Sequence, residues 1–322
     1  MERRQIGQLS VSAVGLGCNN FGRKLDADDS AAVVGAALDA GIDLFDTADI
    51  YGYGDHEYSG VGRSEEFLGR ALGYRRDEVT VASKFGISMS KTDPSMRGGG
   101  RAWVRRACED SLRRLGTDHI DLYQMHRPDR DSHVSETLEV LTELDDEGKV
   151  RVVGCSNFDA DQLEEADAIS RERGLVRFES VQNELSLLRR EAEADVLPAC
   201  ERLGVAFLPY FPLASGLLTG KYRKGEDAPE GTRLAFWKEP RPHQRLDDDV
   251  LDQVEILSEA AEASGHTILE LAFSWLLTRP TVPSVIAGAT TPDQVRATVA
   301  AAEWSISSEE METIDRALQR IG

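Results

Sequence analysis

The chain has 322 residues and a formal net charge of −20. Such an excess of acidic side chains argues against nucleic acid or an anionic membrane surface as a partner. No stretch is apolar enough over sufficient length to span a bilayer, and no charged-then-apolar leader is present, so we expect a protein of the cytoplasm. No linker, repeat or low-complexity tract divides the sequence, and we expect residues 1–322 to form a single domain.

In chain order, the first fifteen residues predict a short β-hairpin that turns at Gly7 and Gln8. Apolar strand-like runs then recur along the chain, and segments with helical spacing lie between most of them. The helical spacing is clearest in three sets of positions: Val104, Cys108, Ser111 and Leu115; Leu138, Leu141 and Leu144; Val254, Leu257 and Ala261. The strand-like runs are SAVGLGC at 12–18, GIDLFDTA at 41–48, EVTVASKFG at 78–86, HIDLYQMH at 119–126, KVRVVGCSN at 149–157, FESVQNE at 178–184, GVAFLPY at 204–210 and TVPSVIAGA at 281–289.

This alternation predicts an α/β fold, a (β/α)8 TIM barrel, because parallel strands that are apolar on both faces need helices to cover them. We expect the hairpin to plug the bottom of the barrel and long loops to surround the C-terminal ends of the strands, where barrel active sites lie. A doubly wound open sheet is the structural alternative. However, no strand is followed by G-x-G-x-x-G, and Gly15-Leu16-Gly17 lacks the third glycine.

Four ionisable side chains follow these strands: Asp46, Tyr51, Lys84 and His126. If they converge, an acid, a phenol, an amine and an imidazole form a site that delivers a proton, which predicts a reductase. Each residue taken alone also has a structural explanation. Asp46 can cap a turn, Tyr51 lies in a glycine-rich loop beside Tyr53, Lys84 can be a surface lysine, and His126 can bond a loop carbonyl.

Two loops near the C-terminus have features of a phosphate site. The run that ends at Ala289 leads into Thr291-Pro292-Asp293-Gln294, which predicts a helix start with a capping box and Pro at its first position. Free amides and the dipole of such a helix favour phosphate. The loop 215–220 adds glycines, and Lys221 adds a cation. Barrels often build phosphate sites from their last two loops, although routine helix capping explains either loop alone.

Taken together, these segments resemble the aldo-keto reductase family, in its bacterial-type, potassium-channel beta-subunit-like branch. The resemblance implies a β/α barrel and reversible hydride transfer between a nicotinamide cofactor, usually NADPH, and an aldehyde or ketone. It rests on GLGCNNFG at 15–22, DLFDTADIYG at 43–52, GRSEEFLGRAL at 62–72, VASKFG at 81–86, DLYQMHRPD at 121–129, GCSNF at 154–158, QNELSLL at 182–188, LPYFPLASGLLTGKY at 208–222 and IAGATTPDQV at 286–295.

The family's catalytic Asp, Tyr, Lys and His fall on Asp46, Tyr51, Lys84 and His126. Tyr51 is expected to donate the proton, with Lys84 lowering the pKa of its phenol. Asp46 would hold Lys84 charged. His126 can donate to the carbonyl oxygen, orient the substrate or share the proton with Tyr51.

Cofactor contacts follow from the same resemblance. Ser156, Asn157 and Gln182 are expected to bind the nicotinamide carboxamide, and Tyr210 to stack on its ring, although a buried core tyrosine is the alternative. The other expected contacts are Gly17, Asp46, Leu213, Ser215, Gly216, Leu218 and Lys221, then Ile286, Gly288, Thr290, Thr291, Gln294 and Thr298 at or near the adenosine end.

The sequence departs from the family pattern at this adenosine end. Many members have Lys or Arg where this chain has Gly288, Thr290 and Gln294, and Glu-Asn where it has Ala297 and Thr298. Cations there are expected to grip the 2′-phosphate. NADPH is the leading cofactor on family frequency and NADH the alternative; Thr290, Thr291, helix-end amides or Arg296 are candidates for holding the phosphate.

Substrate choice is expected to lie in the loops 53–62, 86–101 and 222–247. Their glycines and mixed polarity are typical of mobile lids. The loop 86–101, with Met89 and Met96, is rich in Ser, Lys and Gly, which favours a flap over a rigid wall, and the loop 222–247 contains Phe236 and Trp237. The partner is a small carbonyl compound that the sequence does not specify, and the oligomeric state stays open. Two other functions stay possible: a Schiff-base aldolase using Lys84, and a nicotinamide-binding regulatory subunit.

A metal site is not expected, because the sequence offers no His-x-His and no carboxylate cluster. The cysteines have no C-x-x-C spacing, which predicts reduced and mostly buried thiols at Cys18, Cys108, Cys155 and Cys200.

Overall fold

A computed structural model describes residues 1–52, 61–222, 224–230, 232–236 and 247–321. An antiparallel hairpin precedes an eight-stranded parallel sheet in the order β10-β3-β4-β5-β6-β7-β8-β9. The strands are β1 (Arg3–Ile6), β2 (Leu9–Ser12), β3 (Val14–Gly17), β4 (Leu44–Asp46), β5 (Thr80–Phe85), β6 (Ile120–Met125), β7 (Val150–Ser156), β8 (Phe178–Glu184), β9 (Ala206–Tyr210) and β10 (Val285–Gly288).

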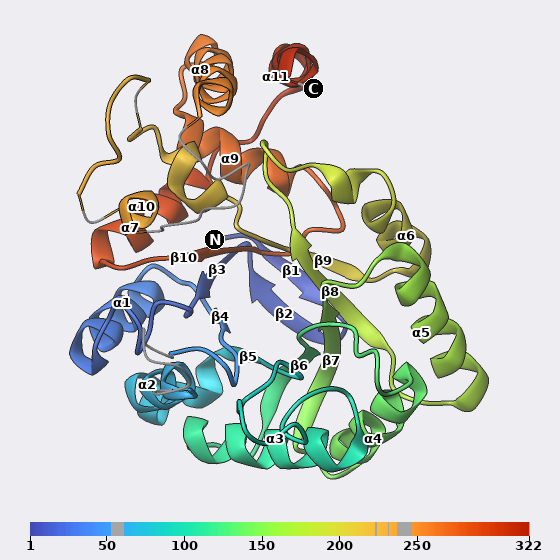
Figure 1. Cartoon of the computed structure of the whole chain (residues 1–322). Helices are drawn as coiled ribbons and strands as arrows, with labels where there is room; N and C mark the ends of the chain where they lie inside the picture. The colour runs from blue at the N-terminus through green and yellow to red at the C-terminus, as the bar shows by residue number, and fades with distance from the viewer. Residues whose placement is uncertain (53–60, 223, 231, 237–246, 322) are drawn as a thin grey trace.

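The helices form a ring outside the sheet (Figure 1). They are α1 (Ala27–Asp39), α2 (Arg63–Leu72), α3 (Arg101–Leu115), α4 (Val134–Asp146), α5 (Ala160–Arg173), α6 (Val196–Leu203), α7 (Arg233–Phe236), α8 (Asp248–Ala263), α9 (Ile268–Leu277), α10 (Pro292–Ala301) and α11 (Ser308–Ile321), with 3-10 turns η1 (Gly73–Glu78), η2 (Glu191–Glu193) and η3 (Ala214–Thr219). The first strand of the sheet in the chain, β3, pairs with β10, and β9 contacts β10, so the sheet curls into a nearly closed barrel. The predicted β/α barrel is confirmed.

Alternation along each strand divides the core into two parts. Outward residues such as Phe45, Val81 and Tyr123 pack under the helices in the larger apolar cluster. Side chains on the inward face recur at every second residue of a strand, so they form layers along the barrel axis, and these layers change from apolar to polar. Their lower layer is apolar and consists of Leu44, Ala82, Leu122, Val152, Leu208 and Ile286.

The predicted hairpin closes the bottom of the barrel. Ile6 and Val11, both fully buried, pack against this lower inward layer, and Figure 1 shows the hairpin at the centre of the ring. Its turn lies at Gly7, whose φ of +53° suits glycine. Because the bottom is filled with apolar side chains, polar inward residues can gather only at the opposite end, two residues further along the strands.

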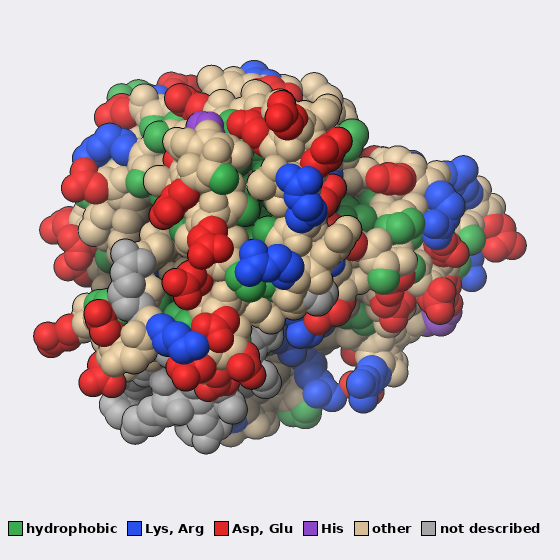
Figure 2. All heavy atoms as spheres, turned by 90° about the horizontal axis from the view of Figure 1, so that it is seen from above, with side chains coloured by type: hydrophobic (Ala, Val, Ile, Leu, Met, Phe, Trp, Pro, Cys, Tyr) green, Lys and Arg blue, Asp and Glu red, His purple; other side chains and the backbone are tan. Residues whose placement is uncertain are grey.

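The surface carries the acidic excess of the sequence. Figure 2 shows Asp and Glu side chains spread over the face seen from above, with Lys and Arg side chains between them. In the part of the chain that the structure describes, no helix is both long and apolar enough to cross a membrane. An anionic ligand must therefore be held by local groups rather than attracted by overall charge.

Candidate active site and cofactor pocket

The upper ends of β4 and β5 bring Asp46 and Lys84 together. Lys84 Nζ lies 2.7 Å from each carboxylate oxygen of Asp46 and donates to the Thr47 carbonyl at 2.9 Å. The amides of Gln182 and Gln124 donate to Asp46 Oδ1 at 2.9 and 3.4 Å. Lys84 is fully buried, so the structural explanation of Lys84 as a surface lysine is wrong.

Tyr51 is held over this pair by its backbone. The loop after β4 lies across the end of β5, where Asp49 N donates to the Lys84 carbonyl at 3.1 Å. The Tyr51 carbonyl accepts from Gly62 N at 3.0 Å and from Ser64 N at 3.4 Å, at the start of α2. The Lys84 ammonium lies 5.2 Å from the centre of the Tyr51 ring. The phenol and the ammonium therefore share one end of the barrel.

His126 completes the group from the end of β6. Its ring meets the Tyr51 ring edge-on, with centroids 5.8 Å apart and planes at 81°. Its backbone N donates to the Phe85 carbonyl at 2.8 Å, and its carbonyl accepts from Asn157 Nδ2 at 3.0 Å. The four residues that the sequence singled out come from three strand ends and meet at one place.

Burial and charge set the protonation of these groups. Burial lowers the pKa of Lys84, but the charge of Asp46 and contact with Tyr51 raise it more, so the net direction is upward and the amine stays charged. Burial, together with the charges of Lys84 and Arg127, holds the pKa of His126 well below its usual range, so the imidazole is neutral. Burial raises the pKa of Tyr51 more than Lys84 lowers it. Lys84 thus lowers the pKa of Tyr51 as expected, but the net direction in the chain without a ligand is upward.

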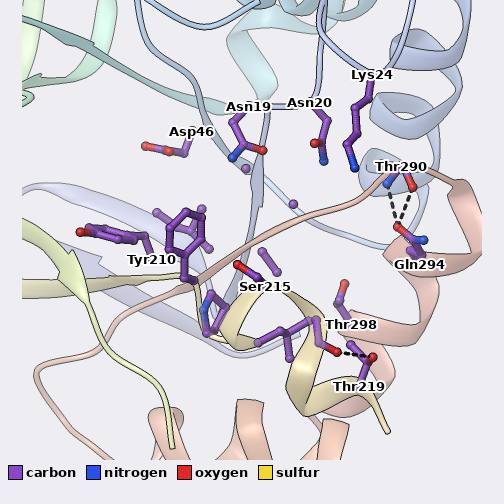
Figure 3. Close-up of a pocket in the computed structure, with 18 of the residues that line it drawn as sticks. Asn19, Asn20, Lys24, Asp46, Tyr210, Ser215, Thr219, Thr290, Gln294 and Thr298 are labelled. Carbon is purple, nitrogen blue, oxygen red and sulfur yellow. Dashed lines mark hydrogen bonds between the residues drawn. The ribbon is translucent and has the colours of Figure 1, made fainter. Parts of the chain in front are cut away.

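A cavity of about 760 Å³ begins at these residues and continues to the N-terminus of α10. Figure 3 shows Asp46 and Tyr210 toward one end and Thr290 and Gln294 toward the other. Its walls contain most of the expected cofactor contacts: Gly17, Asp46, Ser156, Asn157, Gln182, Tyr210, Leu213, Ser215, Gly216, Lys221, Ile286, Gly288, Thr290, Gln294 and Thr298.

Two expected contacts lie elsewhere. Leu218 is fully buried in the larger apolar cluster, because η3 turns its side chain toward the core. Thr291 is the N-cap of α10 and is exposed, and its hydroxyl accepts from Gln294 N at 3.3 Å. The predicted capping box is only half formed, since Gln294 Oε1 accepts from Thr290 N at 2.8 Å instead of from the N-cap amide.

The nicotinamide end is organised by bonds between the expected contacts themselves. Tyr210 Oη donates to Asn157 Oδ1 at 2.9 Å, and Ser156 Oγ donates to the Gln182 carbonyl at 2.7 Å. Asn157 adopts a φ of +61°, which asparagine tolerates better than most residues. Tyr210 is half-buried and lines the cavity, so the alternative of a buried core tyrosine is wrong.

Several residues of the cavity wall have no local signal in the sequence. Asn19, Asn20, Lys24 and Leu25 reach it from the loop between β3 and α1. They lie in or just after the segment GLGCNNFG at 15–22, whose signal in the sequence is its resemblance to the family. Which of its side chains face the cavity depends on how the loop folds over the neighbouring strand end.

The loop 86–101 does not line this cavity. Gly98 N donates to the Gly86 carbonyl at 2.9 Å, and Met89 N to the Met96 carbonyl at 2.9 Å. Gly99 N donates to Asp129 Oδ2 at 2.8 Å. These bonds close the loop on itself and anchor it, which does not fit the expected flap. Of the other two expected specificity loops, residues 53–60, 223, 231 and 237–246, including Trp237, lie outside the described residues, as does the Phe236 side chain.

Comparison with known proteins agrees with this architecture. The profile of the Aldo/keto reductase family matches residues 13–319. The chain is 37% identical to the uncharacterized oxidoreductase YrpG of Bacillus subtilis, over 96% of this chain and 93% of that protein. It is 34% identical to a probable voltage-gated potassium channel subunit beta of Oryza sativa subsp. japonica, over 92% and 89% of the two chains.

Among solved structures, a glycerol dehydrogenase from Gluconobacter oxydans superposes with a TM-score of 0.82 at 31% identity, covering 99% of this chain and 95% of that one. The family match spans nearly the whole barrel, including all eight strands of its sheet. This chain is a member of the aldo/keto reductase family and has the fold of an oxidoreductase of that family.

Proposed function

We propose that this protein reduces an aldehyde or ketone with a nicotinamide cofactor, NADPH in preference to NADH, and oxidises the alcohol in reverse. The observation that carries the proposal is the meeting of Asp46, Tyr51, Lys84 and His126 at one end of the long cavity. An aldo/keto reductase needs such a proton donor beside the carbonyl and room for a dinucleotide behind it.

The walls of the cavity fit such a cofactor. Three buried polar atoms in them have no partner among the described residues: Asn19 Oδ1, His126 Nδ1 and Ser215 Oγ. Buried polar atoms in native proteins are normally bonded, so these suggest a polar ligand. These three atoms belong to segments far apart in the sequence that line the same cavity. A dinucleotide that spans the cavity would contact all of these segments.

When bound, the cofactor supplies the hydride. Ser156, Asn157 and Gln182 would hold its carboxamide, and Gln182 Oε1 is suited to accept because the Nε2 atom already donates to Asp46. Tyr210 would stack on the ring. Ser215, Gly216 and Lys221 would face the pyrophosphate, and the loop after β10 the adenosine.

The protein's own residues then handle the proton. The raised pKa of Tyr51 keeps its phenol protonated until negative charge develops on the substrate oxygen, which then takes the proton. The Lys84 ammonium stabilises the phenolate that is left, and Asp46 keeps that ammonium charged and in place. Neutral His126 can give the oxygen a hydrogen bond but is a poor source of a proton.

The alternative functions have weaker support. A Schiff-base lysine must be neutral to attack a carbonyl, whereas Lys84 is ion-paired and its pKa is raised. Three relatives are named as probable or putative voltage-gated potassium channel beta subunits, so a regulatory role is kept as an outcome of the test. We also propose a cytoplasmic location, supported by four free, buried cysteines.

The test is oxidation of NADPH and NADH by the purified protein with a reactive aromatic aldehyde. We expect Tyr51→Phe to lose about 10²- to 10⁴-fold in rate while still binding cofactor. Tyr74→Phe is the matched control, because Tyr74 is 94% exposed and does not line the cavity. A Tyr51→Phe variant with the wild-type rate would overturn the proton-donor role. Cofactor binding without turnover across a panel of carbonyls would favour the regulatory subunit.

A further inference from the structure

We propose that Lys24, on the loop between β3 and α1, supplies the cation that recognises the 2′-phosphate of NADPH. The inference rests on the nicotinamide-cofactor function proposed above and explains how this chain can prefer NADPH without the family's usual cations. The cavity-lining residues of β10, α10 and the loop between them carry no charge: Ile286, Ala287, Gly288, Thr290, Gln294, Ala297 and Thr298.

Three residues with fixed positive charge line the cavity in the part of the chain that the structure describes: Lys24, Arg127 and Lys221. Arg127 follows His126 at the catalytic end. Lys221 lies against η3, with Nζ 3.0 Å from where a Cβ on Gly216 would stand. In Figure 3 the Lys24 side chain points toward Thr290 and Gln294. The three cations are therefore distributed along the cavity.

Arg296 is not placed for this role. Its guanidinium lies 2.5 Å from the carboxylate of Asp293, one turn earlier in α10, and its side chain is 61% exposed. It does not line the cavity. The pair instead offsets the negative charge that Asp293 brings to the first turn of the helix, where a phosphate would otherwise meet repulsion.

The backbone that carries Lys24 is held in place. The amides of Lys24 and Leu25 both donate to the Asn20 carbonyl, at 2.8 and 3.0 Å, and Phe21 and Leu25 are buried. Asn20 Nδ2 donates to the Ala289 carbonyl at 3.4 Å, which joins this turn to the loop before α10. Lys24 thus starts from a turn attached to the adenosine end, and its side chain is exposed.

Neutral donors face Lys24 from the other side. Gln294 Oε1 accepts from both Thr290 N and Thr290 Oγ1, at 2.8 and 3.1 Å, which fixes the amide and leaves its nitrogen to a ligand. The N-terminus of α10 adds the positive end of its dipole. An ammonium opposite an amide donor and a helix start is a suitable environment for a phosphate dianion, and the charge of the ammonium favours that dianion over the neutral ribose hydroxyl of NADH.

The test compares dissociation constants for NADPH and NADH, measured by quenching of protein fluorescence, in wild type, Lys24→Met, Lys24→Arg and Arg23→Met. Wild type should bind NADPH more tightly. Lys24→Met should lower the ratio of NADPH to NADH affinity by about 10- to 100-fold, the effect of losing a charged hydrogen bond. Lys24→Arg should keep most of that ratio. Arg23→Met removes a neighbouring exposed charge that does not line the cavity, and should leave the ratio unchanged.

The outcomes separate the two proposals. If wild type binds both cofactors but Lys24→Met keeps the wild-type ratio, or loses no more of it than Arg23→Met, the assignment of Lys24 is wrong and the reductase function stands. If wild type binds NADH as tightly as NADPH, the assignment of Lys24 is also wrong and the reductase function again stands. If neither cofactor binds, the proposed function itself fails, and the inference with it. Equal thermal unfolding midpoints of the four proteins would show that folding is not the cause.

Discussion

The Lys84 ammonium bridges both oxygens of Asp46 at 2.7 Å, and the two side chains are 0% and 6% exposed. Two charges removed from water in this way must compensate each other, because an unpaired buried charge costs far more than the pair contributes. The pair therefore contributes both to the stability of the fold and to the proposed carbonyl reduction. Mutation can separate its effect on stability from its effect on the reaction.

Lys84→Met should destabilise the fold by about 3–5 kcal/mol, since Asp46 would be left buried without its cation. The measurement is urea unfolding followed by circular dichroism. In the double variant Asp46→Asn with Lys84→Met, most of this loss should be recovered, because no charge remains unpaired. Carbonyl reduction should stay low in both proteins. A double variant less stable than the single one would contradict this account of the pair.

His126 predicts a pH dependence of stability. Its pKa in the fold lies well below the ordinary 6.5, because of burial and the charge of Lys84. Below about pH 6.5 the unfolded chain therefore binds a proton at His126 that the folded chain does not. As the pH is lowered from there, the free energy of unfolding decreases by up to about 1.4 kcal/mol per pH unit until the pKa of His126 in the fold is reached. His126→Gln should remove this component.

The measurement is the difference in unfolding free energy between wild type and His126→Gln, from about pH 7.5 to about pH 5. Taking the difference cancels Asp49, whose pKa burial raises well above 3.8 and which acts in the opposite direction in both proteins. A difference that does not change with pH would mean that His126 takes up its proton equally in both states.

Tyr210 should hold the cofactor through its ring more than through its hydroxyl. Tyr210→Ala is expected to weaken cofactor binding about tenfold, because a stacked aromatic surface is lost. Tyr210→Phe keeps the ring and loses the hydroxyl with its 2.9 Å bond to Asn157, so its effect should be smaller. The check is fluorescence titration with NADPH. Equal losses in the two variants would argue that Tyr210 acts by positioning Asn157.

Two helical glycines should respond oppositely to alanine. A Cβ on Gly69 of α2 would lie 2.2 Å from the carbonyl oxygen of Leu115, at the end of α3, so Gly69→Ala should destabilise by about 1–3 kcal/mol. A Cβ on Gly35 of α1 meets nothing within 4 Å. Gly35→Ala should therefore stabilise by about 0.5–1 kcal/mol, and thermal unfolding would compare the two. Similar effects of both changes would show that α2 and α3 adjust easily.

The strand ends were predictable because their signal is local. Alternation of buried positions and the change from apolar to polar at Asp46, Lys84 and His126 are visible in the residue order alone. Barrel topology then requires that these ends meet at one face, since all eight strands run parallel. Their convergence thus followed from the fold class without knowledge of any distance.

Other features were not predictable because they depend on packing between segments far apart in sequence. Whether the pKa of Tyr51 is raised or lowered depends on the balance between burial, which raises it, and the charge of Lys84, which lowers it. The anchoring of the loop 86–101 depends on Asp129 from the next loop. The burial of Leu218 depends on how η3 turns.

By itself, then, the sequence determined the barrel and its hairpin plug, because hydrophobic periodicity and strand order specify them. The resemblance to a family singled out the four residues at the mouth of the barrel. Only the tertiary structure decided which loops line the cavity, and it brought Lys24 over α10 from the opposite end of the chain. The physical reason is that a parallel barrel pairs its first strand, β3, with its last, β10. Residues separated by most of the sequence become neighbours there, and no local pattern records their contact.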